Sequence, residues 1–343
     1  MESMNLTTLA LGASAVLALI ILGKNGQPFR DKWETENGKV HSLRKLPVQG
    51  ESVPFQFIKD NPILPVLLDG DEHLTCWIVD TGYGFSAVDV RLAERLRLPK
   101  NGRLSVQTLQ TDDLQATTVP RGFIFDLETG QADVEIPPHS AVIRDLPNTL
   151  ESTHGTFSRC LKPGGILGIT FLQNFVTRLD YVNQTLTFFD PERFVYRGSG
   201  MRFDGWLEDE HYFLIPVVMD GILANMALDT GAFSTIMTKG FLDKYKKEKG
   251  YGFGNSKTAG ENGSTVRASF SESPIELRSK TLRRAEIGTH LMNGMEVLFP
   301  EKETPGLLET SRFSGLLGYN VLKNFIIYLI YKPTPYVILE AIQ

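Results

Sequence analysis

Two short apolar runs in this chain each stop abruptly at an acid. Residues 76–79 read Cys-Trp-Ile-Val and lead into Asp80, and residues 226–228 read Met-Ala-Leu and lead into Asp229. Short, uninterrupted apolar runs of this kind predict buried strands. A buried strand does not end on a carboxylate unless a partner or a function keeps the charge there, because an unpaired charge is costly to remove from water. We therefore predict that both acids are functional.

The sequence around the two acids is repeated. Asp80 and Asp229 are each followed by Thr-Gly. A glycine-ended apolar run closes at Gly168, 88 residues after Asp80, and another closes at Gly318, 89 residues after Asp229. Phe-Leu-Gln-Asn-Phe follows the first glycine and Val-Leu-Lys-Asn-Phe follows the second. We interpret the second half of the chain as a copy of the first.

Each half is predicted to contain a strand, an Asp-Thr-Gly loop, a second strand, a short helix and several β segments. Apolar residues recur at helical spacing in residues 89–98 and 239–249, and both helices are expected to cover a barrel. Residues 196–200, Tyr-Arg-Gly-Ser-Gly, have the composition of a linker. The prediction is a fold of two related, mainly β halves with short helices, over residues 52–197 and 201–343.

The first residues of the chain are predicted to lie outside both lobes. Residues 6–23 carry no charge, and these eighteen residues are just long enough to span a bilayer. A cleaved signal peptide begins with basic residues and ends in a small-x-small site, whereas this segment holds Glu2 and ends in Ile-Ile-Leu-Gly. We therefore expect residues 1–24 to form an uncleaved, single-pass transmembrane helix, followed by a polar stalk over residues 25–51.

The side of the membrane is left open. Three basic residues follow the apolar segment, and by the positive-inside rule they favour the cytoplasmic side for the rest of the chain: Lys24, Arg30 and Lys32. Three charges are too few to decide the orientation.

The composition is that of a folded enzyme. The chain has 343 residues, of which 42% are apolar and 22% are charged, enough to bury two sizeable cores. A formal net charge of −5, without a basic stripe of interleaved aromatics, argues against a nucleic-acid partner. Cys76 and Cys160 are the two cysteines; a disulfide and two buried free thiols both fit, and free thiols are favoured. No spacing of Cys and His indicates a metal site, and no cofactor is expected.

Two equivalent acids brought together by duplication can act as one unit. Carboxylates about 3 Å apart cannot both ionise, so they share a proton. The charged member can deprotonate a water while the neutral member donates a hydrogen bond to a substrate carbonyl, which is chemistry for amide hydrolysis. We expect Thr81 and Thr230 to hydrogen-bond across the approximate two-fold axis. Gly82 and Gly231 would permit a close approach that a Cβ would obstruct.

These motifs resemble those of aspartic peptidases of the retropepsin-like and pepsin-like clan, with both lobes in one polypeptide. Residues 229–232, Asp-Thr-Gly-Ala, match the retropepsin active-site motif, and the two Leu-Gly runs match the hydrophobic-hydrophobic-glycine element of the family. The first lobe departs from the pattern, because Tyr83 stands where Ala or Ser is usual, as in a variant seen in bacterial retropepsin-like proteins. The resemblance spans about residues 53–341. It implies an all-β acid-protease fold of two pseudo-two-fold related β-barrel lobes, and an aspartic endopeptidase with Asp80 and Asp229 as the catalytic pair.

The resemblance also implies β-hairpin flaps that cover an extended substrate. In the second lobe, a glycine-bearing turn within residues 258–264 suits a hairpin tip, and an ordinary surface turn fits it equally well. The flap candidates are Gly260, Glu261, Asn262 and Gly263. The equivalent in the first lobe is expected near residues 110–117, with its turn at residues 111–113, Thr-Asp-Asp.

The sequence therefore predicts a membrane-tethered aspartic endopeptidase that acts on a peptide or protein substrate as a single chain. One alternative is a catalytically silent peptide-binding protein that keeps the cleft. Retention of both Asp-Thr-Gly triplets argues against it, because a single Asp→Asn change would silence the pair. Another alternative is an obligate homodimer in which each chain carries two half-sites, although the matched separations favour pairing within one chain.

Overall fold

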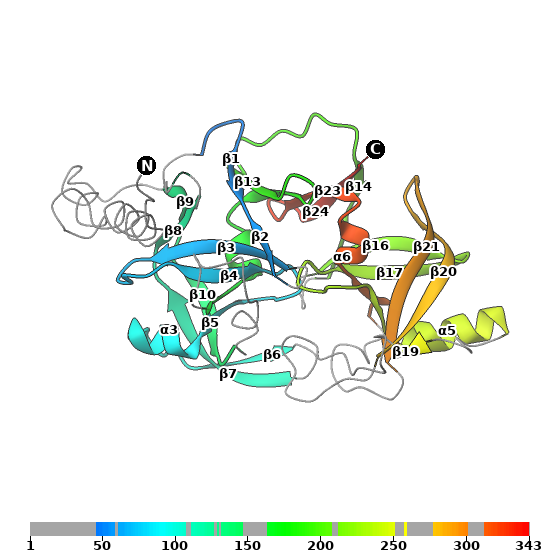
Figure 1. The fold of residues 1–343 in the computed structure, drawn as a ribbon, viewed down its shortest axis with the longest axis horizontal. Helices are drawn as coiled ribbons and strands as arrows, with labels where there is room; N and C mark the ends of the chain where they lie inside the picture. The colour runs from blue at the N-terminus through cyan, green and yellow to red at the C-terminus, as the bar shows by residue number, and fades with distance from the viewer. Residues whose placement is uncertain are drawn as a thin grey trace, which may run out of the picture.

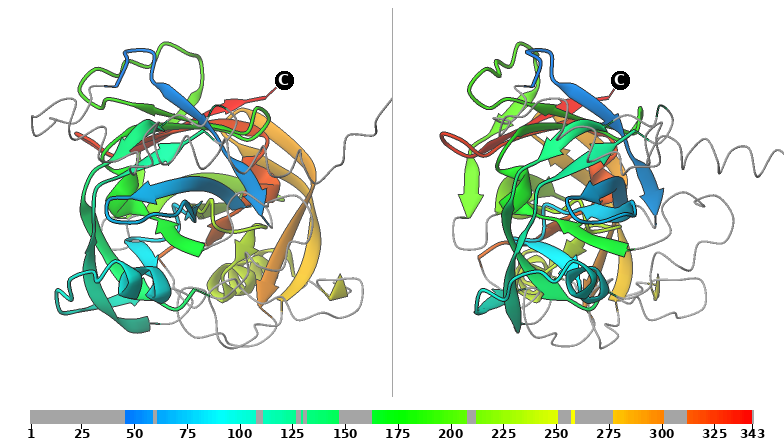
Figure 2. Two further views of the ribbon diagram at one scale, coloured as in Figure 1. Left: turned by 60° about the vertical axis from the view of Figure 1, so that its left-hand side comes forward. Right: turned by 90° about the vertical axis from the view of Figure 1, so that its left-hand side faces the viewer.

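The computed structural model describes residues 46–58, 61–107, 111–126, 129, 132–146, 163–207, 212–250, 257–258, 277–300 and 312–342. Strands dominate these residues, and the helices among them are short (Figures 1 and 2). The all-β fold class predicted from the sequence is confirmed. Two barrel-like sheets lie side by side in Figure 1, and a third sheet lies above and between them.

The first half of the chain forms a sheet with ten strands among the described residues. The spatial order is β6-β7-β10-β5-β11-β4-β3-β8-β9, with β2 beside β3. The strands are β2 (Gln56–Ile58), β3 (Asn61–Leu68), β4 (Thr75–Val79), β5 (Ser86–Asp89), β6 (Arg103–Gln107), β7 (Thr111–Val119), β8 (Gly122–Phe125), β9 (Ala132–Ile136), β10 (His139–Arg144) and β11 (Pro163–Leu167).

The second half forms a sheet with eight strands among the described residues. The order is β15-β16-β17-β22-β18-β21-β20-β19, and an additional pairing of β16 with β20 curls the sheet back on itself. The strands are β15 (Gly205–Leu207), β16 (Tyr212–Met219), β17 (Ile222–Leu228), β18 (Ile236–Met237), β19 (Lys257–Thr258), β20 (Leu277–Ile287), β21 (His290–Pro300) and β22 (Gly315–Leu317).

A six-stranded sheet joins the two halves. Its order is β1-β13-β12-β23-β24-β14, and the halves meet where β12 pairs antiparallel with β23. Figure 1 shows this sheet between the two lobes. The strands are β1 (Glu51–Pro54), β12 (Val176–Asp180), β13 (Thr185–Phe189), β14 (Met201–Phe203), β23 (Phe325–Ile330) and β24 (Tyr336–Ala341).

The duplication is visible in the order of the elements. In the first half, β11 leads through α4 (Ile169–Leu172) to the paired strands β12 and β13. In the second half, β22 leads through α6 (Tyr319–Leu322) to the paired strands β23 and β24. These are the segments whose sequences repeat.

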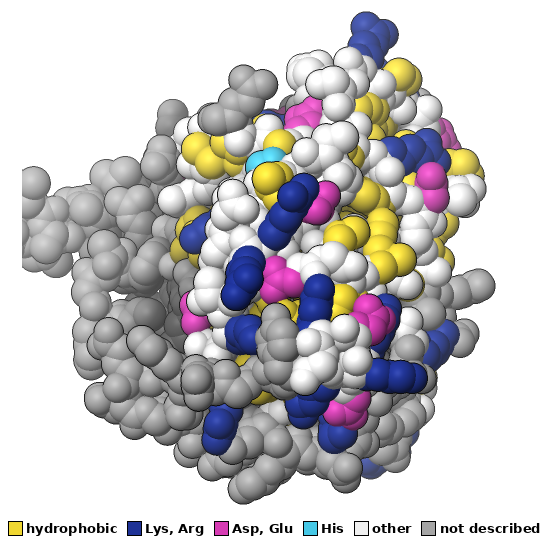
Figure 3. Space-filling model, turned by 90° about the vertical axis from the view of Figure 1, so that its right-hand side faces the viewer, with side chains coloured by type: hydrophobic (Ala, Val, Ile, Leu, Met, Phe, Trp, Pro, Cys, Tyr) yellow, Lys and Arg dark blue, Asp and Glu magenta, His cyan; other side chains and the backbone are white. Residues whose placement is uncertain are grey.

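The two longer helices form where the apolar spacing predicts them. Helix α5 spans Lys239–Lys249, begins with Thr238 accepting a hydrogen bond from the Phe241 N–H, and ends at Gly250 with a left-handed φ of 69°. Helix α3 spans only Val90–Arg95, with Asp89 as its N-cap, and so is shorter than the predicted 89–98. It ends early because Arg97 has a φ of 50°, two residues before Pro99. Figure 3 shows Lys and Arg side chains gathered on the side of the molecule where α5 lies.

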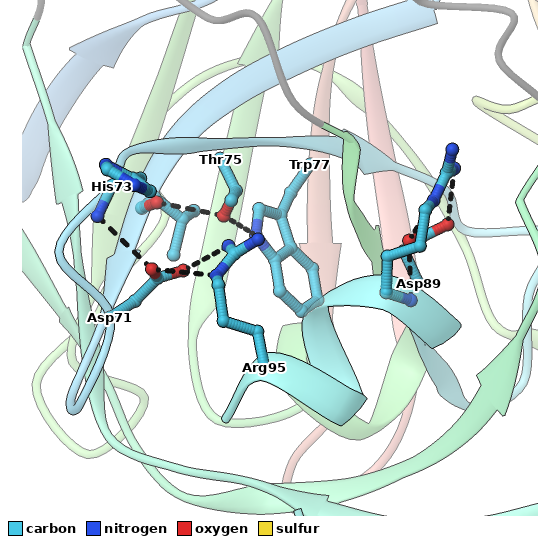
Figure 4. A network of polar contacts seen from close by, with 8 residues as sticks. Asp71, His73, Thr75, Trp77, Asp89 and Arg95 are labelled. Atoms are coloured by element: carbon cyan, nitrogen blue, oxygen red, sulfur yellow. Dashed lines mark hydrogen bonds and ion pairs between the residues drawn. The ribbon is translucent and has the colours of Figure 1, made fainter. Parts of the chain in front are cut away.

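Buried polar contacts anchor the strand that leads to Asp80. The indole Nε1 of Trp77 donates to Thr75 Oγ1 at 2.9 Å, and that hydroxyl donates to the Val66 carbonyl at 3.1 Å (Figure 4). Arg95 binds Asp71 at 2.7 Å and so ties α3 to the turn between β3 and β4. These contacts hold the N-terminal part of β4 and the turn before it.

Cys76 corrects one expectation. It is disulfide-bonded, so the favoured interpretation of two free thiols is wrong for this residue. Cys76 pairs in register with Pro163 of the parallel strand β11, three residues after Cys160, the other cysteine in the sequence. Local pattern could not predict this register, because it depends on a strand pairing of long sequence separation. Cys160 itself lies outside the described residues.

The predicted anchor, residues 1–24, and most of the predicted stalk also lie outside the described residues. Among the helices that the structure does describe, none has the length and apolar character needed to cross a membrane.

Candidate active site

Each acid follows a strand that ends beside a glycine-ended run. The backbone N–H of Asp80 donates to the Leu167 carbonyl at 3.1 Å, and that of Asp229 donates to the Leu317 carbonyl at 3.1 Å. These bonds extend the parallel pairings of β4 with β11 and of β17 with β22. The repeated sequence therefore builds the same local structure twice.

The glycines that end those runs allow backbone to pack on backbone. A Cβ at Gly168 would lie 2.1 Å from the Phe85 carbonyl oxygen, and one at Gly318 would lie 2.4 Å from that of Ser234. The next residue in each run donates its N–H to the active-site loop: Ile169 to the Tyr83 carbonyl at 3.0 Å, and Tyr319 to the Ala232 carbonyl at 2.8 Å. Each Asp-Thr-Gly loop thus packs directly, backbone to backbone, against the glycine-ended segment of its own half.

The structure brings Asp80 and Asp229 together. Both are buried, with 5% and 8% exposure, and the two carboxyl groups lie close enough for each to change the pKa of the other. A Cβ at Gly82 would lie 2.5 Å from Asp229 Cγ, and one at Gly231 would lie 2.4 Å from Asp80 Cγ. Each glycine therefore makes room for the carboxyl group of the opposite loop, the role expected of them from the sequence.

The two threonines are cross-linked by hydrogen bonds. The backbone N–H of Thr81 donates to Thr230 Oγ1, and that of Thr230 donates to Thr81 Oγ1, both at 3.0 Å. The hydroxyls also reach into the opposite strand, where Thr81 donates to the Leu228 carbonyl at 3.1 Å and Thr230 to the Val79 carbonyl at 2.9 Å. All four groups are buried, so these bonds lock the two loops together.

Burial changes the acidity of both carboxyl groups. Burial raises the pKa of Asp80 well above its ordinary value, and the nearby charge of Asp229 raises it further. Burial also raises the pKa of Asp229, to about 6, against the opposing effect of hydrogen bonds from Gly231, Asp80 and Ala232. The pair therefore keeps a proton at a pH where ordinary carboxyl groups are ionised.

The two loops differ in how they hold their acids. Asp229 Oδ1 accepts the Gly231 N–H at 2.8 Å and the Ala232 N–H at 3.0 Å. Asp80 Oδ1 accepts the Gly82 N–H at 2.7 Å. Tyr83, the residue that departs from the family pattern, turns its ring into the first-lobe core, and its hydroxyl accepts a hydrogen bond from Arg144 at 3.1 Å.

A cluster of aromatic residues includes Tyr181, a buried side chain close to the pair. Tyr181 stacks on Phe57 with ring centroids 5.8 Å apart and meets Tyr319 edge-on at 5.3 Å. Burial raises the pKa of the Tyr181 hydroxyl well above its ordinary value, and the charges of Asp229 and Asp80 contribute. Burial in these surroundings strengthens the electrostatic interaction between the two carboxyl groups.

The structure describes the flap candidate of the first lobe but not that of the second. Gly260, Glu261, Asn262 and Gly263 lie outside the described residues. In the first lobe, residues 111–113 are not a turn, because they begin strand β7 and pair with β6 from Gln107 opposite Thr111. The connection falls between those two residues. A glycine-free sequence does not distinguish a strand from a turn by itself, and pairing with β6 decided the conformation.

Sequence reasoning missed Tyr212. Its hydroxyl donates to the Gly82 carbonyl at 2.7 Å and so joins the second lobe to the first active-site loop. In the sequence, Tyr212 opens an apolar strand and carries no signal that separates it from a core residue. No group of three or more His, Cys, Asp or Glu side chains in the described ranges is placed to hold a metal ion, and a metal-free site stays a prediction.

No protein-family model and no curated protein matches the chain. Among solved structures, it is similar to a retropepsin-like aspartic protease from Rickettsia conorii, at 16% identity and a TM-score of 0.30, over 43% of this chain and 98% of the other. It is also similar to Basic 7S globulin from soybean, at 10% identity and a TM-score of 0.46, over 85% of this chain and 94% of the other. Both likenesses are weak.

Proposed function

We propose that this chain is an aspartic endopeptidase that hydrolyses peptide bonds with Asp80 and Asp229 as its catalytic pair. The observation that carries the proposal is the burial of two carboxyl groups against the glycines of each other's loops, each acid at the end of a duplicated strand. A core gains nothing from burying two acids against each other, because like charges and desolvation both oppose it. Paired acids in this arrangement are suited to general acid–base catalysis.

The contacts assign a role to each acid. Two backbone N–H bonds stabilise the charged form of Asp229, so we take it as the ionised member and Asp80 as the protonated one. A water between them would give a proton to Asp229 while its oxygen attacks the substrate carbonyl carbon. Asp80 would donate its proton to the carbonyl oxygen. Asp229 would then pass its proton to the leaving amine nitrogen while Asp80 takes a proton from a hydroxyl of the resulting diol. The C–N bond breaks, a carboxylic acid forms and the pair regains its starting protonation.

The rigid loops fit this mechanism. The threonine cross-link and the two glycine contacts hold the carboxyl groups without help from a substrate. Preorganised groups need no rearrangement when charge develops in the transition state. A second candidate function is silent peptide binding, which requires the two acids to be inert. None of the contacts described above at the two acids favours an inert pair.

The test is cleavage of a mixed peptide library, followed by mass spectrometry. We expect wild type to cut internal peptide bonds and Asp229→Asn to lose the activity. The matched control is Asp69→Asn, which removes a carboxylate that pairs with Arg121 at 3.0 Å in the turn after β3 and should leave cleavage unchanged. If wild type bound library peptides but released no fragments at any pH on either side of about 6, the pKa of Asp229, the silent-binding alternative would be correct.

The location is a further part of the proposal. We propose that residues 1–24 tether the enzyme to a membrane as a single-pass anchor, based on the uncharged residues 6–23. The tether would place the pair near membrane-associated substrates and would not take part in the chemistry.

A further inference from the structure

One side chain of the second lobe reaches the active-site loop of the first. Tyr212, the first residue of β16, donates its hydroxyl to the Gly82 carbonyl at 2.7 Å. Its ring is 3% exposed and packs against Phe313, with ring centroids 5.6 Å apart. A buried ring held on one face has little freedom, so its hydroxyl is a fixed donor.

Gly82 is the residue of the first loop that touches both acids. Its N–H donates to Asp80 Oδ1 at 2.7 Å, and its Cα lies so close to the other acid that a Cβ would meet Asp229 Cγ at 2.5 Å. A rotation of Gly82 would therefore disturb the N–H bond to Asp80 and the packing on Asp229 together. The bond from Tyr212 opposes that rotation.

The first loop has fewer bonds to its carboxyl group than the second. Asp229 Oδ1 accepts two backbone N–H groups, from Gly231 and Ala232. In the first loop, the Tyr83 N–H meets the Asp80 main-chain carbonyl at 3.4 Å, and Gly82 supplies the backbone bond to the carboxylate. The hydrogen bond from Tyr212 to the Gly82 carbonyl restrains this loop from the other lobe.

The residue at this position differs between the two halves of the duplicated fold. Strands β3 and β16 have eight residues each and carry proline at the fifth position, so Tyr212 corresponds to Asn61. Asparagine and tyrosine differ in length and in chemistry. The second half therefore carries at this position a phenol that the first half lacks.

We propose that Tyr212 is a positioning residue that holds Gly82, and through it Asp80, in the geometry needed for catalysis. The inference rests on the proposed peptidase function. Tyr212 contacts the first loop at the Gly82 carbonyl. It therefore acts on Asp80 through Gly82, and not on the substrate. Its effect should thus appear in kcat and in the mobility of the loop, and not in the strength of substrate binding.

The test is Tyr212→Phe, which keeps the ring and removes the hydroxyl. We expect kcat to fall by about tenfold, the effect of one lost hydrogen bond, with KM changed by less than about twofold. Hydrogen exchange of a peptide covering residues 78–86 should become faster. The matched control is Tyr331→Phe, because Tyr331 is a buried neighbour of Phe213 whose hydroxyl has no hydrogen-bond partner in the described part of the chain. It should leave kcat and exchange unchanged.

The readouts separate the two proposals. Faster exchange in Tyr212→Phe, with no cleavage by wild type, would reject the peptidase function and keep the structural role of Tyr212. Unchanged kcat and unchanged exchange, or an equal loss in Tyr331→Phe, would overturn the positioning role. If Tyr212→Phe did not fold, Phe313→Leu would loosen the packing of the same ring, and the same loss of kcat is expected from it.

Discussion

The backbone N–H of Thr81 donates to Thr230 Oγ1 at 3.0 Å, and the backbone N–H of Thr230 donates to Thr81 Oγ1 at the same distance. Residues 149 positions apart in the sequence thus make a reciprocal pair in the buried centre of the molecule. Each hydroxyl in turn donates to a carbonyl of the opposite half, at Leu228 and Val79. The pair joins the two halves at the point where their acids meet.

Thr81→Val should destabilise the protein by about 2 to 6 kcal/mol. The change leaves the Thr230 N–H and the Leu228 carbonyl buried without their partner, and each unsatisfied group costs about 1 to 3 kcal/mol. Thr81→Ser keeps the hydroxyl and is the matched control, with an expected loss below about 1.5 kcal/mol. Urea unfolding measures both variants. Equal stability of the Val and Ser variants would show that the cross-link contributes little.

Activity should follow a bell-shaped dependence on pH. Catalysis needs one proton on the pair, so the rate should rise as the more acidic carboxyl group ionises and fall as the second does. Burial raises both pKa values, that of Asp229 to about 6 and that of Asp80 well above its ordinary value. The rising limb is therefore expected near pH 6 and the falling limb above it. Profiles of kcat/KM on a peptide with no titratable groups check this, and a flat profile from pH 4 to 8 contradicts it.

Stability should fall as pH rises through the pKa values of the pair. Because both folded-state values are raised, the folded protein binds more protons than the unfolded chain between about pH 4 and pH 6 and above. Ionisation of the buried pair lowers the free energy of unfolding of wild type as pH rises. Asp229→Asn removes one of the two titrating groups, so the free energy of unfolding of the variant should gain about 1 to 3 kcal/mol relative to wild type from pH 4 to pH 7.

Unfolding in urea at each pH measures the gain. Tyr331→Phe changes no carboxyl group and serves as the control, with a difference from wild type that should not vary over this range. A difference between Asp229→Asn and wild type that is also constant with pH would mean that the buried pair does not titrate abnormally.

Deletion of residues 1–24 should release a soluble protein that still cleaves peptides. The deleted residues carry the uncharged segment that we propose as the anchor, and they precede β1, the first strand described, by more than 20 residues. Flotation with liposomes, thermal melting and cleavage of one soluble peptide compare the two forms. Truncated protein that still floats with liposomes, or that no longer melts cooperatively, would show that the segment is not a dispensable anchor.

Local pattern was sufficient for the parts of the fold that local forces determine. The apolar runs before Asp80 and Asp229 are strands, and α5 has the predicted bounds of Lys239–Lys249 because its cap residues and apolar face lie within one segment. The repeated Asp-Thr-Gly triplets also identified the two acids that the structure places together.

Contacts between distant segments could not be predicted in this way. The pairing of β1 with β13, the bond from Tyr212 to Gly82 and the disulfide at Cys76 each depend on where a strand lies in the folded molecule. A tyrosine at the start of an apolar strand looks like any core residue until its partner is known. For the same reason, strand β7 was mistaken for a turn at Thr111, since its pairing with β6 gave no local signal.

The central claim is that Asp80 and Asp229 form one catalytic unit, and a double-mutant cycle tests it most directly. Purified Asp80→Asn, Asp229→Asn and the double variant are assayed on one peptide, with folding checked by melting. We predict that each single variant loses several orders of magnitude in kcat and that the double variant loses no more, because either change disables the shared proton. A single variant that retains the wild-type rate, or losses that simply multiply in the double variant, would contradict the account.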